Sequence, residues 1–185
     1  MHATEHRRDD ASPRRAEAQP GKYLTFRLAG EIYGLPVFAV REIIRLLPIT
    51  PVASMPAHVR GVINLRGKVI PVVDLRTRFG LTTTPDNDRT CIIVAQVAVA
   101  SGSRAYGVVV EGLEEVVAFK AGDIEPTPDF GGAVDVRFIT GIATPGSTLT
   151  TLIDLDAIAA ADFRLAETAL SKSVGPPNHR AVTAP

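Results

Sequence analysis

An internal repeat limits the fold of this chain more than any other feature of its sequence. The pair Tyr33-Gly34 recurs as Tyr106-Gly107, 73 residues further on, and the segment 61–75 recurs as 141–155, 80 residues further on. The two blocks keep their order, and the seven extra residues of the second offset fall in a segment where Pro and Gly cluster. A chain that carries one unit twice is expected to fold as two similar units packed against each other.

Short apolar runs rich in Val and Ile, bounded by Gly, Asn, Asp or Pro, are typical of strands. We expect strands at 22–28, 32–37, 69–75, 91–99, 105–110, 138–143 and 149–155. The segment 37–47 differs, because its apolar residues have the spacing of one face of a short helix. These residues are Val37, Val40, Ile43, Ile44 and Leu47. The Ala-rich segment 156–170 predicts a C-terminal helix, so the chain is expected to be mainly β with short helices.

The two ends of the chain differ from its middle. Residues 1–20 and 171–185 carry charges, Ala and Pro without hydrophobic periodicity, so burial cannot offset the entropy of ordering them. We expect residues 1–20 to be a disordered arm and 21–163 to be the folded domain. The end of the C-terminal helix and a flexible tail would make up 164–185.

Composition argues against several classes of partner. Lys plus Arg equals Asp plus Glu at 20 each, which leaves no excess positive charge to neutralise the phosphates of a nucleic acid. The single cysteine, Cys91, cannot form an internal disulfide and lies in an apolar run, which favours a reducing cytoplasm. No apolar run of about 18 residues could span a bilayer, so membrane contact is expected only through another protein.

Motifs for catalysis or cofactor binding are not visible in the sequence. His58 is the one histidine in the expected domain, and no His, Cys, Asp or Glu cluster has the spacing of metal ligands. Asp74 and Asp154 occupy equivalent positions of the two repeats, which could suggest the carboxylate pair of a glycosidase. Each also follows a strand and precedes a helix-compatible segment, and we expect both to cap helices. The prediction is a protein without metal, cofactor or enzymatic activity.

The sequence also resembles a known family. The segment 58–76, which reads HVRGVINLRGKVIPVVDLR, closely resembles the signature stretch of CheW-like domains, and the segments 23–26, 33–34, 40–44 and 139–142 resemble the family in the same order. The resemblance covers about residues 21–163. It implies a mainly β fold of two intertwined SH3-like five-stranded β-barrels, with short helices and a C-terminal helix.

This resemblance implies a non-catalytic adaptor that couples chemoreceptors to the chemotaxis histidine kinase of a bacterial signalling array. The cytoplasmic tip of a methyl-accepting receptor would dock in a groove between the barrels, at Val40, Glu42, Arg66, Cys91 and Val116. The regulatory domain of the kinase would pair with the chain barrel to barrel, through residues that the resemblance does not assign. The protein would be cytoplasmic and would reach the membrane indirectly, through receptor arrays.

Other interpretations stay open at this stage. By pattern alone, Arg66 is a solvated hairpin tip, Glu42 is a solvated residue of the short helix, and Val40 belongs to the core. The chain could also be a CheW-like adaptor of a non-chemotactic pathway that controls motility or a second messenger. A small-ligand-binding β-barrel protein that uses the groove as a pocket is a further alternative.

Overall fold

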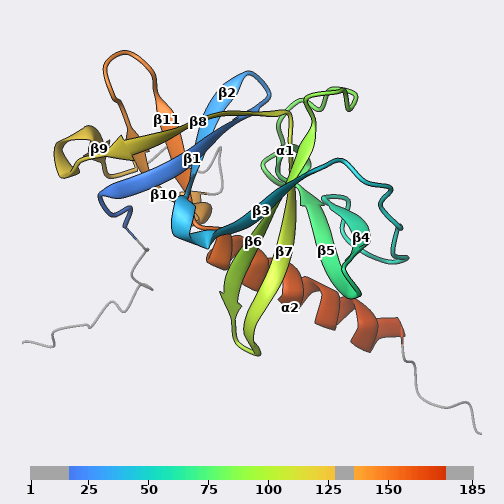
Figure 1. The fold of residues 1–185 in the computed structure, drawn as a ribbon. Coiled ribbons are helices and arrows are strands. Elements are labelled where there is room, and N and C mark those ends of the chain that lie inside the picture. Colours follow the sequence, from blue (N-terminus) through green and yellow to red (C-terminus); the bar gives the residue numbers. More distant parts are fainter. Residues whose placement is uncertain (1–16, 128–135, 174–185) are drawn as a thin grey trace, which may run out of the picture.

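The structure is a computed structural model that describes residues 17–127 and 136–173, and its strands form two sheets (Figure 1). The first sheet, called barrel one, contains in spatial order β8 (Gly112–Phe119), β1 (Gly21–Leu28), β2 (Glu31–Pro36), β11 (Thr150–Ile153), β10 (Ile139–Ala143) and β9 (Ile124–Glu125). The second, called barrel two, contains β3 (Val40–Arg45), β6 (Cys91–Val99), β7 (Gly102–Val110), β5 (Lys68–Asp74) and β4 (Val59–Leu65). The predicted fold class is therefore confirmed.

Helices are few among the described residues. The longest is α2 (Leu155–Ser173), which runs along barrel two and confirms the predicted C-terminal helix (Figure 1). The others are α1 (Leu75–Arg78), η1 (Val37–Ala39), η2 (Ala121–Asp123) and η3 (Val136–Phe138). Of the predicted end segments, residues 1–16 and 174–185 lie outside the described residues, whereas Ala18 N donates to Thr140 O of barrel one at 3.0 Å.

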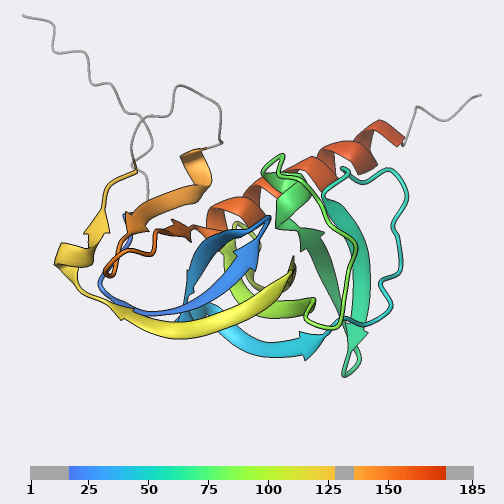
Figure 2. The ribbon, with the colours of Figure 1, turned by 90° about the horizontal axis from the view of Figure 1, so that it is seen from above.

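Each barrel is assembled from both sequence repeats. Repeat one supplies β1 to β5 and repeat two supplies β6 to β11, but barrel one combines β1 and β2 with β8, β10 and β11. Barrel two combines β6 and β7 of repeat two with β3, β4 and β5 of repeat one. Figure 2 shows the two barrels side by side with the chain crossing between them. Neither repeat can complete a barrel alone, so the two units are intertwined.

The repeated glycine of the Tyr-Gly pair lies where the repeats meet. Gly34 on β2 is opposite Leu152 on the parallel strand β11, and Gly107 on β7 is opposite Val72 on the parallel strand β5. A Cβ atom at Gly34 would lie 2.9 Å from Leu152 Cδ2, and one at Gly107 would lie 3.1 Å from Val72 Cγ2. Glycine fits closely at both positions, because a side chain there would force Leu152 or Val72 of the neighbouring strand to shift.

The second repeated block places a bulge in equivalent strands. The register shifts between Val59 and Gly61 where β4 pairs with β5, and between Ile139 and Gly141 where β10 pairs with β11. Gly61 has φ +136°, and a Cβ atom there would lie 2.1 Å from Thr50 O. Glycine at position 61 is therefore required both by the backbone conformation and by the close approach of a neighbouring chain segment.

One hydrophobic core joins the barrels. It contains Phe26 and Leu35 from barrel one, Ile93 and Val108 from barrel two, and Ile158 from α2, all fully buried. Burial of a side chain of this size stabilises a fold by about 1.5–3 kcal/mol. Because these residues pack on one another, the barrels and α2 are expected to unfold as one unit.

The helix predicted for 37–47 is wrong. The chain makes the short helix η1 and then strand β3, whose residues alternate between partly buried and exposed from Val40 to Arg45. The apolar spacing looked helical because it includes Ile43 and Leu47, which are 41% and 38% exposed and do not belong to one buried face. Pairing of β3 with β6 decides the conformation, since strand preference depends strongly on tertiary contacts.

The close approach at Gly61 makes a stability prediction. We expect Gly61→Ala to lower the free energy of unfolding by at least ~2 kcal/mol, because the new methyl group would overlap Thr50 O. Gly122→Ala is the matched control, since a Cβ atom at Gly122 meets nothing within 4 Å. Chemical denaturation of both variants measures the difference, and equal midpoints would show that the loop at Thr50 moves aside without cost.

Candidate partner-binding surface

An exposed ion pair connects two strands of barrel two. The turn between β4 and β5 carries Arg66, whose Nη1 and Nη2 donate to Glu42 Oε1 and Oε2 on β3 at 2.7 and 2.8 Å. The Arg66 side chain is 75% exposed, and that of Glu42 is 28% exposed. Gly67 N donates to Asn64 Oδ1 at 2.9 Å, which closes the turn beneath the guanidinium. The fold thus brings together Glu42 and Arg66, two of the five receptor-binding residues that the family resemblance implies.

The pair has a defined charge state. Hydrogen bonding from Arg66 lowers the pKa of Glu42, and the hydrogen bond to Glu42 raises the pKa of Arg66. Both groups are therefore ionised at neutral pH, and the pair is lost only as pH falls through the lowered pKa of Glu42. Exposed ion pairs add little to stability. This pair instead provides a fixed, planar arrangement of charged groups that a partner protein can recognise.

A hollow of about 410 Å³ lies beside the ion pair. It is lined by residues of β3, β5, β6 and β7 and of the β4–β5 hairpin, among them Arg41, Leu65, Lys68 and Ile70. All of these elements belong to barrel two. Glu42 and Arg66 therefore stand at the end of one barrel, and the predicted groove between the barrels stays a prediction.

The other three predicted residues have different surroundings. Val40 and Cys91 are partly buried against the shared core, at opposite ends of the pairing between β3 and β6. Burial raises the pKa of the Cys91 thiol. Val116 lies on β8 of barrel one, pairs with Leu24 and is 55% exposed. The structure thus joins Glu42 to Arg66 directly and leaves Val116 on the other barrel.

The apolar spacing of 37–47 puts Ile43 on the apolar face of the expected short helix, but Ile43 is 41% exposed on β3. Its counterpart at the repeat offset of 73 is Val116, which is exposed on β8. The strands β3 and β8 are edge strands of their sheets, and Figure 2 shows them along the same side of the molecule. The repeat itself was the signal that could have identified Ile43 as a surface residue.

The equivalent end of barrel one carries different charges. Its hollow of about 580 Å³ is lined by Thr25, Arg27, Glu114 and Glu115 among others. Glu115 matches Glu42 at the offset of 73, but the counterpart of Arg66 at the offset of 80 is Gly146. Arg27 instead pairs with Glu114, with Nη2 and Oε1 2.7 Å apart. The repeats therefore diverge at the position of the exposed arginine.

A buried carboxylate attaches α2 to barrel two. Asp162 Oδ1 pairs with His58 Nε2 at 2.9 Å and accepts from Arg78 Nε at 3.1 Å, while the Tyr106 hydroxyl donates to Oδ2. Burial, followed by the charge of Asp162, raises the pKa of Tyr106. Sequence reasoning missed this cluster, although a lone aspartate among alanines was a signal. Within the described part of the chain, no group of His, Cys, Asp or Glu is arranged to hold a metal ion.

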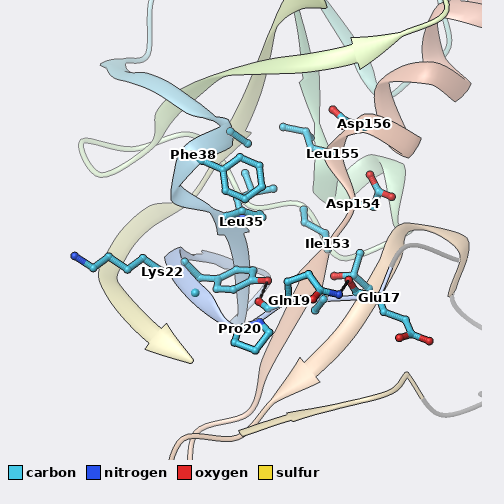
Figure 3. A pocket seen from close by; sticks show the side chains of 16 residues that line it. Glu17, Gln19, Pro20, Lys22, Leu35, Phe38, Ile153, Asp154, Leu155 and Asp156 are labelled. Carbon is cyan, nitrogen blue, oxygen red and sulfur yellow. Dashed lines mark hydrogen bonds between the residues drawn. The ribbon is translucent and has the colours of Figure 1, made fainter. Parts of the chain in front are cut away.

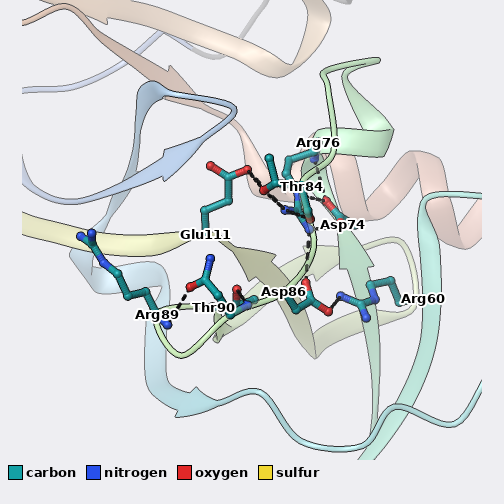
Figure 4. A network of polar contacts seen from close by, with 9 residues as sticks. Arg60, Asp74, Arg76, Thr84, Asp86, Arg89, Thr90 and Glu111 are labelled. Carbon is teal, nitrogen blue, oxygen red and sulfur yellow. Dashed lines mark hydrogen bonds and ion pairs between the residues drawn. The ribbon is translucent and has the colours of Figure 1, made fainter.

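A second buried network surrounds Arg76 (Figure 4). Asp74 Oδ1 accepts from Arg76 N at 2.9 Å, and Arg76 Nη2 donates to Asp74 Oδ2 at 2.7 Å. Arg76 Nη1 also donates to Thr84 O at 3.1 Å, which attaches the segment leading to β6. In repeat two, Ala157 N donates to Asp154 Oδ1 at 2.9 Å. Both aspartates therefore cap helices, as predicted.

Two interlocked β-barrels carry an exposed charged pair and an exposed large apolar residue on an edge strand of each sheet, Ile43 on β3 and Val116 on β8, which suits a protein that binds other proteins. The family model described as CheW-like domain matches residues 22–163. The chain belongs to this family.

Named relatives agree with that assignment. The chain is 36% identical to the chemotaxis protein CheW of Rhizobium meliloti over 135 residues, 73% of this chain and 84% of the relative. It is 32% identical to the chemotaxis protein CheW of Klebsiella aerogenes, over 73% of this chain and 79% of the relative. The crystal structure of the scaffolding protein TtCheW from Thermoanaerobacter tengcongensis superposes with a TM-score of 0.67, at 34% identity, over 74% of this chain and 90% of that one.

These comparisons confirm the predicted family, and the chain is a chemotaxis adaptor of the CheW type. The alternatives, a non-chemotactic adaptor and a small-ligand-binding barrel, are not favoured by the names of the relatives. None of the described helices is long and apolar enough to cross a membrane.

Attachment of α2 by Asp162 can be tested by stability. We expect Asp162→Asn to lower the free energy of unfolding by about 3 kcal/mol, because the largely buried guanidinium of Arg78 would lose its counter-charge. Glu114→Gln removes the charge of an exposed pair and is expected to cost less than about 1 kcal/mol. Urea denaturation gives both values, and similar small losses would contradict the anchoring role.

The electrostatics of the exposed pair can be tested by titration. We expect the carboxyl carbon of Glu42 to titrate below the ordinary glutamate pKa of about 4.3, since Arg66 stabilises the ionised form. Arg66→Ala should raise this pKa toward the ordinary value. Lys68→Ala, which removes another cation that lines the same hollow, should leave it almost unchanged. Carbon-13 NMR against pH measures all three, and an unchanged pKa in Arg66→Ala would contradict the pairing.

Proposed function

We propose that the chain is a non-catalytic adaptor that holds the cytoplasmic tip of a chemoreceptor on one surface and the regulatory domain of the chemotaxis histidine kinase on another. The observation that carries the receptor surface is the exposed Glu42–Arg66 pair, and Ile43 on β3 and Val116 on β8 add exposed apolar side chains on two edge strands. The family assignment supports the kind of partner. The protein acts by binding alone, in the cytoplasm, and reaches the membrane through receptor arrays.

The receptor surface combines apolar contact with charge. Ile43 on β3 and Val116 on β8 are exposed, and Val40 is partly exposed beside Ile43. An amphipathic helical tip could lay its apolar face on such residues, which is a common mode of helix recognition. Arg66 and Glu42 would then pair with charged side chains of the receptor and set its orientation. Cys91 belongs to the same proposed surface, where its partly buried side chain supports β3 from β6.

This surface depends on the placement of one barrel against the other. Val40, Ile43, Glu42 and Arg66 are on barrel two, whereas Val116 is on barrel one. The shared core and the exchanged strands hold these groups in one arrangement. A preorganised surface loses less entropy on binding, which suits weak contacts that are repeated many times in an array. The kinase regulatory domain pairs with the chain barrel to barrel in this proposal.

Co-sedimentation with receptor fragments and the kinase tests the proposal. We expect Arg66→Glu to weaken ternary assembly at least tenfold, a loss of about 1.4 kcal/mol, because it places a second carboxylate beside Glu42. The charge-exchanged variant Glu42→Arg with Arg66→Glu is the matched control. It restores an internal pair but presents the opposite charges to the receptor, so assembly should stay weak.

Two outcomes would contradict this scheme. Full assembly in the charge-exchanged variant would show that Arg66 acts only through Glu42, and not by contact with the receptor. Failure of the unmodified protein to bind either partner would remove the adaptor function itself. Thermal unfolding of each variant establishes that the changes act on binding rather than on folding, since both side chains are at the surface.

A further inference from the structure

Barrel one carries a pocket that includes none of the residues of the proposed receptor surface (Figure 3). Its volume is about 330 Å³, and apolar side chains of Leu35, Ile153 and Leu155 line it. Phe38 of η1 stands at its edge and is 91% exposed. An aromatic ring left in water beside an apolar hollow is an unfavourable arrangement unless another surface covers it.

Carboxylates stand on the side of this pocket opposite Phe38. Glu17, Asp154 and Asp156 lie there, whereas the Lys22 amine extends away from it (Figure 3). Asp156 Oδ1 accepts from Ala98 N at 2.9 Å, and Asp154 caps α2, so both are held in place. None of the three carboxylates forms an ion pair with another described residue. The pocket is apolar at its base and acidic along one side.

The sequence repeat identifies the counterpart of this pocket in barrel two. At the two offsets, Phe38 corresponds to Glu111 and Asp156 corresponds to Arg76. These are members of the buried network of Figure 4, in which Arg76 is only 2% exposed. The connecting segment between α1 and β6 covers Arg76 there, because Nη1 donates to Thr84 O at 3.1 Å and Nη2 lies 3.5 Å from Asp86 Oδ1. In barrel two, an extended segment of polypeptide therefore occupies the equivalent place.

In barrel one the equivalent place is open, because after Asp156 the chain continues as α2 instead of turning back over the barrel. The charge is reversed at one position, since Arg76 of barrel two corresponds to Asp156 of barrel one, whereas Asp74 and Asp154 are acidic in both. The basic Arg76 receives a segment that supplies a carbonyl and the carboxylate of Asp86. The acidic pocket with its exposed Phe38 is complementary to a segment in which a large apolar side chain is next to a cationic one.

We propose that this pocket binds an extended segment of a partner protein in which a large apolar side chain is adjacent to Arg or Lys. The apolar side chain packs on the exposed ring of Phe38 over the buried Leu35 and Leu155, while the cation pairs with Asp156. The N-terminal residues 1–16 of the chain do not fit this description, since Met1 is their one large apolar side chain. The surface shares no residue with the receptor surface, so the inference goes beyond the proposed function and does not rest on it.

Fluorescence anisotropy with two labelled peptides tests this inference on the full chain. The probes are Gly-Arg-Leu-Arg-Gly and the matched acidic peptide Gly-Glu-Leu-Glu-Gly. We expect saturable binding of the basic peptide with a Kd below about 1 mM, and binding of the acidic peptide at least tenfold weaker. Phe38→Ala and Asp156→Asn should each weaken binding of the basic peptide about tenfold. The second variant keeps an amide oxygen for Ala98 N, and Val69→Ala, an exposed residue of barrel two, is the matched control.

Several results would overturn the inference. They are equal affinity for the two peptides, absence of saturable binding, and normal binding by Phe38→Ala. If deletion of residues 1–16 raised the affinity for the basic peptide tenfold or more, the chain itself would be the occupant and the partner segment would be excluded. Loss of receptor co-sedimentation in Phe38→Ala would show that the pocket belongs to the receptor surface, whereas unchanged co-sedimentation together with lost peptide binding would support a separate site.

Discussion

The close parallel contact between the two sequence repeats is the constraint on which the rest of this structure depends. Gly34 and Gly107 allow β2 to lie against β11 and β7 to lie against β5. Parallel strands need a long connection between them, and here β2 reaches β11 through all of barrel two and then β8 to β10, whereas β5 reaches β7 through α1 and β6. The contact therefore joins the two repeats within each barrel, and a side chain at Gly34 or Gly107 would force Leu152 or Val72 to shift.

The two repeats differ at several charged positions. The strands that build the core match between the repeats. At the repeat offsets, however, Arg66 corresponds to a glycine, Arg76 to an aspartate and Glu111 to a phenylalanine. Each difference gives one barrel a charged or apolar surface that the other lacks. A duplicated fold can in this way present several distinct binding surfaces while a single shared core keeps them in fixed relative positions.

Much of this organisation was predictable from residue patterns. The hairpin of β1 and β2, the central strands and the C-terminal helix follow from local apolar periodicity, and the caps at Asp74 and Asp154 follow from their position after a strand. The helix expected at 37–47 failed because Ile43 is apolar for a reason other than burial in the core. The Asp162 cluster joins residues up to 104 positions apart, and no local pattern could reveal its partners.

The sequence by itself determined the duplication, the elements within each repeat and the family, because each of these is encoded in the order of residues along a short segment or in its recurrence. Only the tertiary structure decided that the repeats exchange strands, that Glu42 and Arg66 form a pair, and that Phe38 stands exposed beside an acidic pocket. These features depend on which distant segments come into contact. Packing of the whole core decides which distant segments come into contact, and a local sequence pattern does not contain that information.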